Sequence, residues 1–100
     1  MSAALELARA YGVAVDVADL GDWGESDLRS EYDPHGPSIR INARVARRLT
    51  GADLREFVAL AIGHELYHHR EQLGEIERLP RRSDRESAAD AFARRLFGRG

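Results

Sequence analysis

The first half of the chain alternates between helical and strand-like spacing of its apolar side chains. Residues 3–11 carry them at helical spacing, which predicts a short helix that Gly12 ends. The valines within residues 13–17 alternate with other side chains, as they do in a strand. Two further strands are expected at 28–32 and 38–42, joined by a turn rich in proline and glycine.

Helical spacing dominates the second half of the chain. A short helix is expected at residues 43–49, a long one at 50–73 and a last one at 83–97. Each run comes with a residue whose side chain can cap a helix: Asn42, Thr50 and Ser83. The order of elements predicts an α+β fold, in which a small antiparallel sheet packs on the long helix and the last helix.

Length and composition predict one domain, residues 1–100, of a cytoplasmic protein. The apolar fraction is 43%, too high for a disordered chain, and no apolar run approaches the roughly 20 residues that span a bilayer. Glu6 and Arg9 interrupt the apolar stretch at the start, which argues against a signal peptide. The absence of cysteine excludes disulfides and thiolate metal sites, and it fits a reducing compartment.

The charge of the chain argues against direct binding to nucleic acid. The 15 basic residues, all arginine, are outnumbered by 17 acidic ones, and the formal net charge is −2. A nucleic-acid-binding domain usually has a strongly basic surface, and no helix-turn-helix signature accompanies these arginines. We therefore expect most of them to lie on solvated helix surfaces.

The long helix contains an H-E-x-x-H pattern, His64-Glu65-Leu66-Tyr67-His68. At about 100° per residue, the two histidines lie one turn apart on one face, so both imidazoles can reach one metal ion. Glu65 lies beside them, offset enough to reach a water at the metal, which is where a general base must be. The pattern predicts a catalytic metal site. The alternative is two histidines that match the pattern by chance.

The last helix carries two acids on its apolar side, Glu86 and Asp90, in line with an apolar stripe formed by Ala89, Phe92, Ala93 and Leu96. An unpaired buried carboxylate is costly, so a metal ion facing Glu86 would account for its position. A catalytic zinc needs three protein ligands and one open position, which His64, His68 and Glu86 would supply. Asp90 could accept a hydrogen bond from the outer ring nitrogen of a ligand histidine.

Both acids also have simpler roles open to them. Glu86 could bond back to Ser83 in a capping box, and Asp90 could pair with Arg94. Neither role explains why both acids share the apolar face. Zinc is the expected metal, at one ion per chain. Ligands of these types also bind Mn, Co or Ni, so the sequence does not exclude these metals.

With these motifs the chain resembles the gluzincin metallopeptidases and, more narrowly, the ImmA/IrrE-type peptidases. The narrower resemblance rests on the segment Glu86-Ser-Ala-Ala-Asp-Ala-Phe-Ala-Arg-Arg-Leu96 and on Ser38-Ile-Arg-Ile-Asn42 before the long helix, and it covers residues 28–97. It implies a zincin-like fold and a zinc-dependent endopeptidase with Glu65 as its base. Members of this family typically cut a helix-turn-helix repressor, so it implies a protein substrate of that kind.

Two other functions stay open at this point. The chain could be a non-catalytic, metal-stabilised module that docks a repressor or belongs to a toxin–antitoxin pair, although a structural zinc site does not need Glu65 and usually has four protein ligands. It could also be a latent peptidase similar to the minigluzincins, with residues 1–11 or 97–100 plugging the cleft. The oligomeric state is not predicted.

A peptidase also needs a donor that stabilises the oxyanion. His35, Tyr32 and Trp23 are candidates, and the sequence does not choose among them. His69 could line the cleft, although we expect it to be exposed. A strand within 28–42 is the expected place for a substrate chain to pair in extended form.

Overall fold

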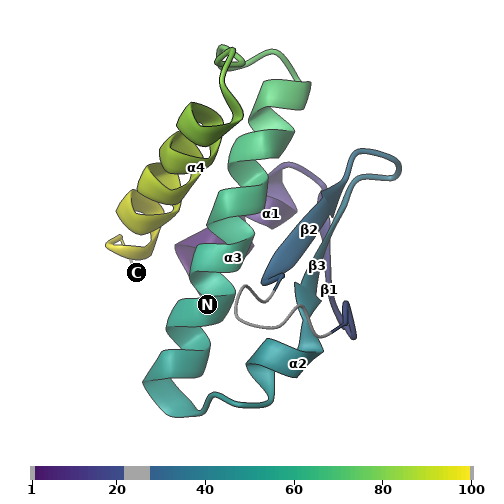
Figure 1. Cartoon of the computed structure of the whole chain (residues 1–100), viewed down its shortest axis with the longest axis vertical. Helices are drawn as coiled ribbons and strands as arrows, with labels where there is room; N and C mark the ends of the chain where they lie inside the picture. The colour runs from purple at the N-terminus through teal and green to yellow at the C-terminus, as the bar shows by residue number, and fades with distance from the viewer. Residues whose placement is uncertain (1, 22–27, 100) are drawn as a thin grey trace.

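The computed structural model describes residues 2–21 and 28–99, so Trp23, one of the oxyanion candidates, lies outside the described residues. The described part forms a small α+β fold, as predicted (Figure 1). Its elements are α1 (Ala3–Ala10), β1 (Ala14–Ala18), β2 (Ser30–Asp33), β3 (Ser38–Asn42), α2 (Ala43–Ala46), α3 (Gly51–Gln72) and α4 (Arg82–Phe97). Each matches a predicted element to within a few residues.

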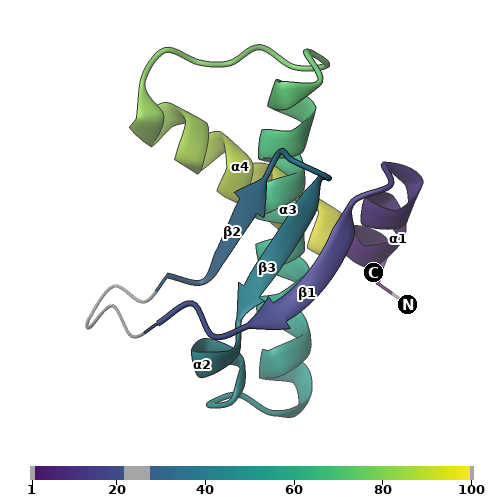
Figure 2. The ribbon, with the colours of Figure 1, turned by 90° about the vertical axis from the view of Figure 1, so that its right-hand side faces the viewer.

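The sheet is mixed, and the prediction of an antiparallel sheet is wrong in this respect. The strand order is β1-β3-β2, with β1 parallel to β3 and β2 antiparallel to it (Figure 2). The tight turn after β2 fixes β2 to one edge of β3, so β1 pairs at the other edge. Each connection reverses the chain, and the first and third strands therefore run in the same direction.

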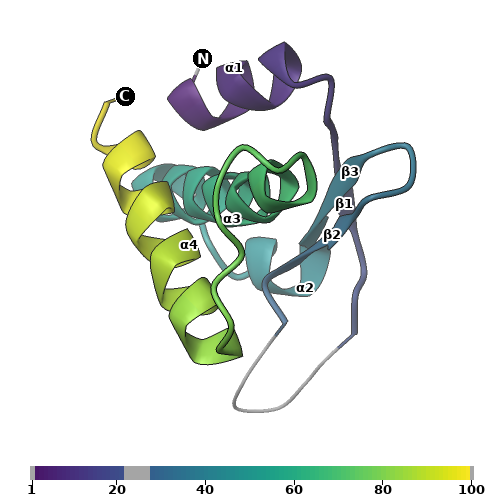
Figure 3. The same ribbon diagram turned by 90° about the horizontal axis from the view of Figure 1, so that it is seen from above.

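The long helix α3 lies between the sheet and α4, and α1 covers a third side (Figure 3). Ile39 and Ile41 of β3 belong to one buried apolar cluster with Ile62 and Leu66 of α3. They are the inward-facing members of a strand whose middle residue, Arg40, is exposed, which is the alternation expected of a half-buried sheet.

Gly63 determines how closely α4 approaches α3. A Cβ atom at this position would lie 2.9 Å from the Cα atom of Ala93, a distance that real Cβ contacts essentially never show. The two helices therefore touch backbone to backbone here. The contact is next to His64, so it brings the first half of α4 against the histidine face of α3.

The helix caps agree with the sequence in part. Asn42 is fully buried and caps α2 through a 3.1 Å bond from the Arg44 amide, while its side-chain nitrogen donates to the carbonyls of Gly21 and Leu28. Thr50 is the N-cap of α3, but its side chain makes no capping bond. Across residues 2–21 and 28–99, none of the helices has the length and hydropathy needed to cross a membrane.

The predicted start of the last helix at Ser83 is wrong. α4 begins at Arg82, and Arg81 Nε donates to Asp84 Oδ2 at 2.8 Å across the first turn. Ser83 is therefore inside the helix and Glu86 lies in its second turn. This excludes the capping-box role for Glu86.

Candidate metal centre

His64 and His68 lie one turn apart on the side of α3 that faces α4, as the H-E-x-x-H spacing predicts. Their side chains are 22% and 21% exposed, so both rings border solvent without projecting into it. The two Nε2 atoms are 3.3 Å apart. Glu86 comes from α4, and its Oε2 atom lies 2.7 Å from His64 Nε2 and 3.3 Å from His68 Nε2.

The outer nitrogen of each ring faces a carboxylate. His64 Nδ1 lies 2.7 Å from Asp90 Oδ1, and His68 Nδ1 lies 2.7 Å from Glu71 Oε1. Because an ionised carboxylate can only accept a hydrogen bond, each Nδ1 carries the proton and donates it. The contact of Asp90 is the one predicted from the sequence. Glu71 was not predicted, although its position three residues after His68 on the same helix face is a signal that could have identified it.

These contacts leave both Nε2 atoms as acceptors that point at a third acceptor, Glu86 Oε2. Three acceptors in mutual contact have no proton to share in this tautomer, and a cation between them removes the conflict. In a tetrahedral zinc site, ligand atoms about 2.0–2.1 Å from the metal lie about 3.3–3.4 Å from one another. Here His68 Nε2 lies 3.3 Å from both His64 Nε2 and Glu86 Oε2. The third separation, from His64 Nε2 to Glu86 Oε2, is 2.7 Å, a hydrogen-bond length. The residues therefore fit a metal ion of this size.

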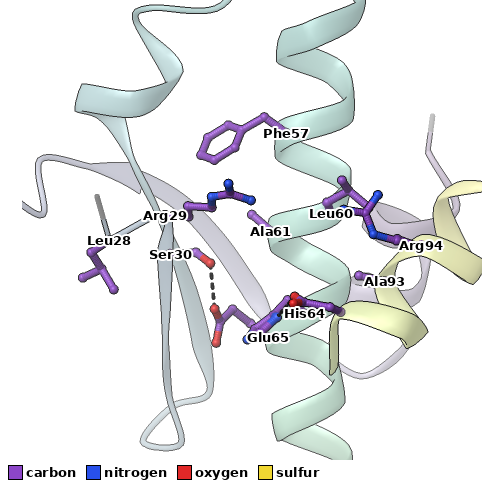
Figure 4. Close-up of a pocket in the computed structure, with 11 residues that line it drawn as sticks. Leu28, Arg29, Ser30, Phe57, Leu60, Ala61, His64, Glu65, Ala93 and Arg94 are labelled. Carbon is purple, nitrogen blue, oxygen red and sulfur yellow. Dashed lines mark hydrogen bonds and ion pairs between the residues drawn. The ribbon is translucent and has the colours of Figure 1, made fainter. Parts of the chain in front are cut away.

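Glu65 lies beside His64, His68 and Glu86, but its carboxylate has a different hydrogen-bond partner. Atoms of His64, Glu65 and His68 that could ligate a metal lie within 4.8 Å of one another, so these three residues by themselves form a group that could hold an ion. Glu65 is buried, and its Oε2 atom accepts a 2.6 Å hydrogen bond from Ser30 Oγ of β2 (Figure 4). Glu86 Oε2, in contrast, contacts both ring nitrogens directly. We therefore regard Glu86 as the better third partner of the histidines.

The environment of Glu65 favours proton uptake. Burial raises the pKa of its carboxyl group, and the hydrogen bond from Ser30 opposes this shift in part. Ser30 was not predicted as a site residue. The signal available in the sequence was its place in a strand expected to flank the helix, but nothing in the strand pattern shows which residue faces Glu65.

His69 and Tyr32 form a second cluster on the other side of α3. Tyr32 Oη lies 2.6 Å from His69 Nδ1, and the ring of Tyr11, the C-cap residue of α1, meets His69 edge-on. His69 is only 5% exposed, so the expectation of an exposed side chain is wrong. The reason is that His69 is rotated by about 100° from His68, which directs it toward α1 and β2. Burial lowers the pKa of His69 and raises that of Tyr32, and both changes favour neutral groups.

The structure does not bring either of the described oxyanion candidates, His35 and Tyr32, to the histidine pair. His35 projects into solvent from the turn after β2, where Asp33 accepts a hydrogen bond from its backbone amide. Tyr32 is engaged by His69. The role of either residue as an oxyanion donor stays a prediction.

A cavity of about 540 Å³ opens from His64 and Glu65 along α3, between the approach to β2 and the second half of α4 (Figure 4). Its size is in the range of small-molecule and peptide side-chain sites. The lining residues are Leu28, Arg29, Ser30, Phe57, Leu60, Ala61, His64, Glu65, Asp90, Ala93 and Arg94.

No protein-family model matches the chain, and neither a search of curated proteins nor one of solved structures finds a match. The chemistry of this centre therefore has to be argued from its own geometry.

Proposed function

We propose that this chain is a zinc-dependent endopeptidase with His64, His68 and Glu86 as its metal ligands. The observation that carries the proposal is the convergence of three acceptor atoms from these residues, with both histidines oriented by carboxylates on their outer nitrogens. A three-ligand set leaves one position open, as catalytic zinc sites do and structural ones do not. The site thus combines a metal-binding geometry with room for a reactant.

Glu65 supplies the acid–base chemistry in this proposal. A zinc ion, when bound, polarises the scissile carbonyl and acidifies water at the site. Glu65 accepts the proton of the attacking water and then donates it to the departing amine. A carboxyl group whose pKa is raised by burial is suited to both steps, since it holds the proton between them more readily than an exposed one. Ser30 fixes the carboxylate in place at 2.6 Å.

The substrate class follows from the resemblance to ImmA/IrrE-type peptidases. We propose a protein substrate in the cytoplasm, such as a helix-turn-helix repressor, cut at a specific bond. The cavity beside Glu65 supports this by offering space for a side chain next to the reacting atoms. Mn, Co or Ni could replace zinc in a site with these ligands.

The first test measures metal per chain and peptide hydrolysis in three proteins: the unaltered chain, Glu86→Ala and Glu65→Gln. We expect about one zinc per chain, loss of most of it in Glu86→Ala, and full metal with at least a 100-fold loss of hydrolysis in Glu65→Gln. Glu56→Gln, the same change at an exposed position of α3, is the matched control and should alter neither quantity.

Three outcomes would contradict the proposal in different ways. No metal in the unaltered chain, after zinc is added back, would remove the site. Metal without hydrolysis of any peptide or candidate repressor would favour the non-catalytic binding module. Undiminished hydrolysis in Glu65→Gln would remove Glu65 from the reaction.

A further inference from the structure

The cavity beside Glu65 has an apolar floor and two positively charged walls. Phe57, Leu60 and Ala61 of α3 form the floor, Arg29 precedes β2, and Arg94 is on α4. Figure 4 shows the two arginine side chains reaching toward α3 from opposite sides, in the half of the cavity away from Glu65. The charges therefore lie across an apolar surface rather than beside the metal group.

The acids that line the same cavity form no ion pair with these arginines among the described residues. Glu65 accepts a hydrogen bond from Ser30, and Asp90 contacts His64 Nδ1. Both carboxylates are at the histidine end and are engaged there. The far end is left with positive charge.

Neither Arg29 nor Arg94 has an ion-pair partner among residues 2–21 and 28–99. Some other exposed arginines do, such as Arg40 with Glu31 and Arg81 with Asp84 at 2.8 Å, so what sets Arg29 and Arg94 apart is their place on two walls of one cavity. Two unpaired guanidinium groups on facing walls repel each other weakly, and an anion between them would relieve that repulsion. A carboxylate is suited to this position because guanidinium groups can bind it through paired hydrogen bonds.

We infer that this cavity is a subsite for an acidic side chain of the substrate, a glutamate in preference to a neutral residue, next to the bond that is cut. The inference rests on the proposed function. The methylene groups of the glutamate would cover the floor at Leu60 and Ala61, and its carboxylate would reach Arg29 and Arg94. The substrate class is thus a polypeptide with an acidic residue beside the cleavage site.

The subsite can be tested by binding, without any turnover. The zinc-loaded chain is titrated with N-acetyl-glutamate methylamide and with its glutamine analogue, while NMR follows the backbone amides of Ala61 and Ala93. We expect the glutamate probe to bind about tenfold more tightly at low salt, from two exposed ion pairs worth about threefold each, and the advantage to shrink as salt is added. Equal affinity for the two probes, or no shift with either up to the solubility limit, would overturn the subsite.

Variants assign the preference to the two arginines. The double variant Arg29→Gln/Arg94→Gln should bind both probes equally, and each single variant should lose about threefold of the preference. Arg95→Gln on α4, which does not line the cavity, is the matched control and should keep the full preference. Amide spectra of each variant establish that it is folded, and the single variants serve if the double one is not. An undiminished tenfold preference in both single variants would contradict the assignment.

A third probe separates the two sources of a carboxylate. N-acetyl-glutamine with a free α-carboxyl group carries the same charge at the chain end instead of the side chain. If it binds as tightly as the glutamate probe, the cavity recognises a chain terminus and the side-chain assignment is wrong. Hydrolysis is scored separately: a chain that discriminates the probes but cuts no peptide overturns the proposed function alone, and one that cuts peptides without discriminating overturns the subsite alone.

Discussion

His68 and His69 are consecutive residues of α3, and their rings lie in two regions that satisfy an imidazole in different ways. The His69 region is enclosed by aromatic rings: the imidazole is buried between Tyr11 and Tyr32, and the Tyr32 hydroxyl lies 2.6 Å from its Nδ1 atom. Burial favours the neutral forms of His69 and Tyr32.

In the His68 region, one ring nitrogen has no hydrogen-bond donor opposite it. Glu71 occupies the outer nitrogen, and the inner nitrogen faces His64 and Glu86, neither of which has a proton to donate in this tautomer. The comparison teaches that burial alone does not identify a functional histidine. The discriminating feature is whether the polar groups around the ring can be satisfied by one another. Around His69, one ring nitrogen has its partner in the Tyr32 hydroxyl. Around His68, the two Nε2 atoms and Glu86 Oε2 have no donor among them in this tautomer, and a bound cation would satisfy all three.

The largest predicted effect separates these two regions directly. If His68 is a zinc ligand as proposed, replacing it with glutamine should weaken zinc binding more than 100-fold, since the change removes a ligand rather than a group that orients one. His69→Gln should leave zinc binding within a few-fold of normal, but lower the free energy of unfolding by about 1–3 kcal/mol, because the Tyr32 hydroxyl loses its buried partner. Competition with a zinc chelator and urea unfolding measure the two quantities.

The two variants control for each other, since they make the same change at adjacent positions. If both variants lost zinc to the same extent, it would be wrong to separate the side of α3 that carries His64 and His68 from the side that carries His69. If His69→Gln left stability unchanged, the cluster around His69 would contribute nothing to the fold.

A second prediction compares the two carboxylates that contact the outer nitrogens of His64 and His68. Asp90 and Glu71 both orient a histidine at 2.7 Å, but the Asp90 side chain is 67% exposed and that of Glu71 is 7% exposed. A buried hydrogen bond to a charged acceptor is stronger than an exposed one, because water competes less. We expect Glu71→Ala to weaken zinc affinity about 100-fold and Asp90→Ala about tenfold.

The same chelator competition measures both variants, with zinc content at saturation as the check that each one still folds. The reverse order of effects would show that the rotation of His64 limits metal binding more than that of His68. Equal, negligible effects would mean that Nε2 is positioned by the helix backbone alone.

The parts of this site that lie along one helix could be predicted from sequence. Helical periodicity correctly places His64 and His68 together. It also predicts that Glu86 and Asp90 point inward with the apolar stripe of α4, and this is wrong: their side chains are 41% and 67% exposed, because they lie at the edge of the stripe where they meet the histidines. The burial of His69 was missed because periodicity gives the direction of a side chain but not the element that covers it. His69 points away from the metal face toward α1 and β2, and no local pattern states that these elements lie there.

Contacts between elements were the part that sequence could not supply. The bond between Ser30 and Glu65 depends on how β2 sits against α3, and the parallel pairing of β1 with β3 depends on which edge of β3 the hairpin leaves free. These are tertiary choices among several arrangements that the same apolar pattern allows. The close approach at Gly63 is of this kind as well, since its composition signal is a single glycine inside a helix.

The smallest predicted effect on the proposed metal site comes from the change Gly63→Ala. This change tests whether the spacing between α3 and α4 affects only the side of α3 that carries His64 and His68. In Gly63→Ala the new Cβ would lie 2.9 Å from the Ala93 backbone, which cannot rotate away as a side chain could. The helices must separate by a few tenths of an ångström, and Glu86 and Asp90 move with α4 while the histidines stay on α3. We expect a loss of about 1–3 kcal/mol in stability and a severalfold loss in zinc affinity.

Gly98→Ala, where the nearest atoms lie at ordinary contact distances of 3.5 and 3.6 Å, is the matched control and should change neither. Because the Tyr11–Tyr32–His69 cluster involves α1, α3 and β2 but not α4, the amide signals around it should be unmoved in Gly63→Ala; changes there as large as those around His64 would mean that the two regions are not independent.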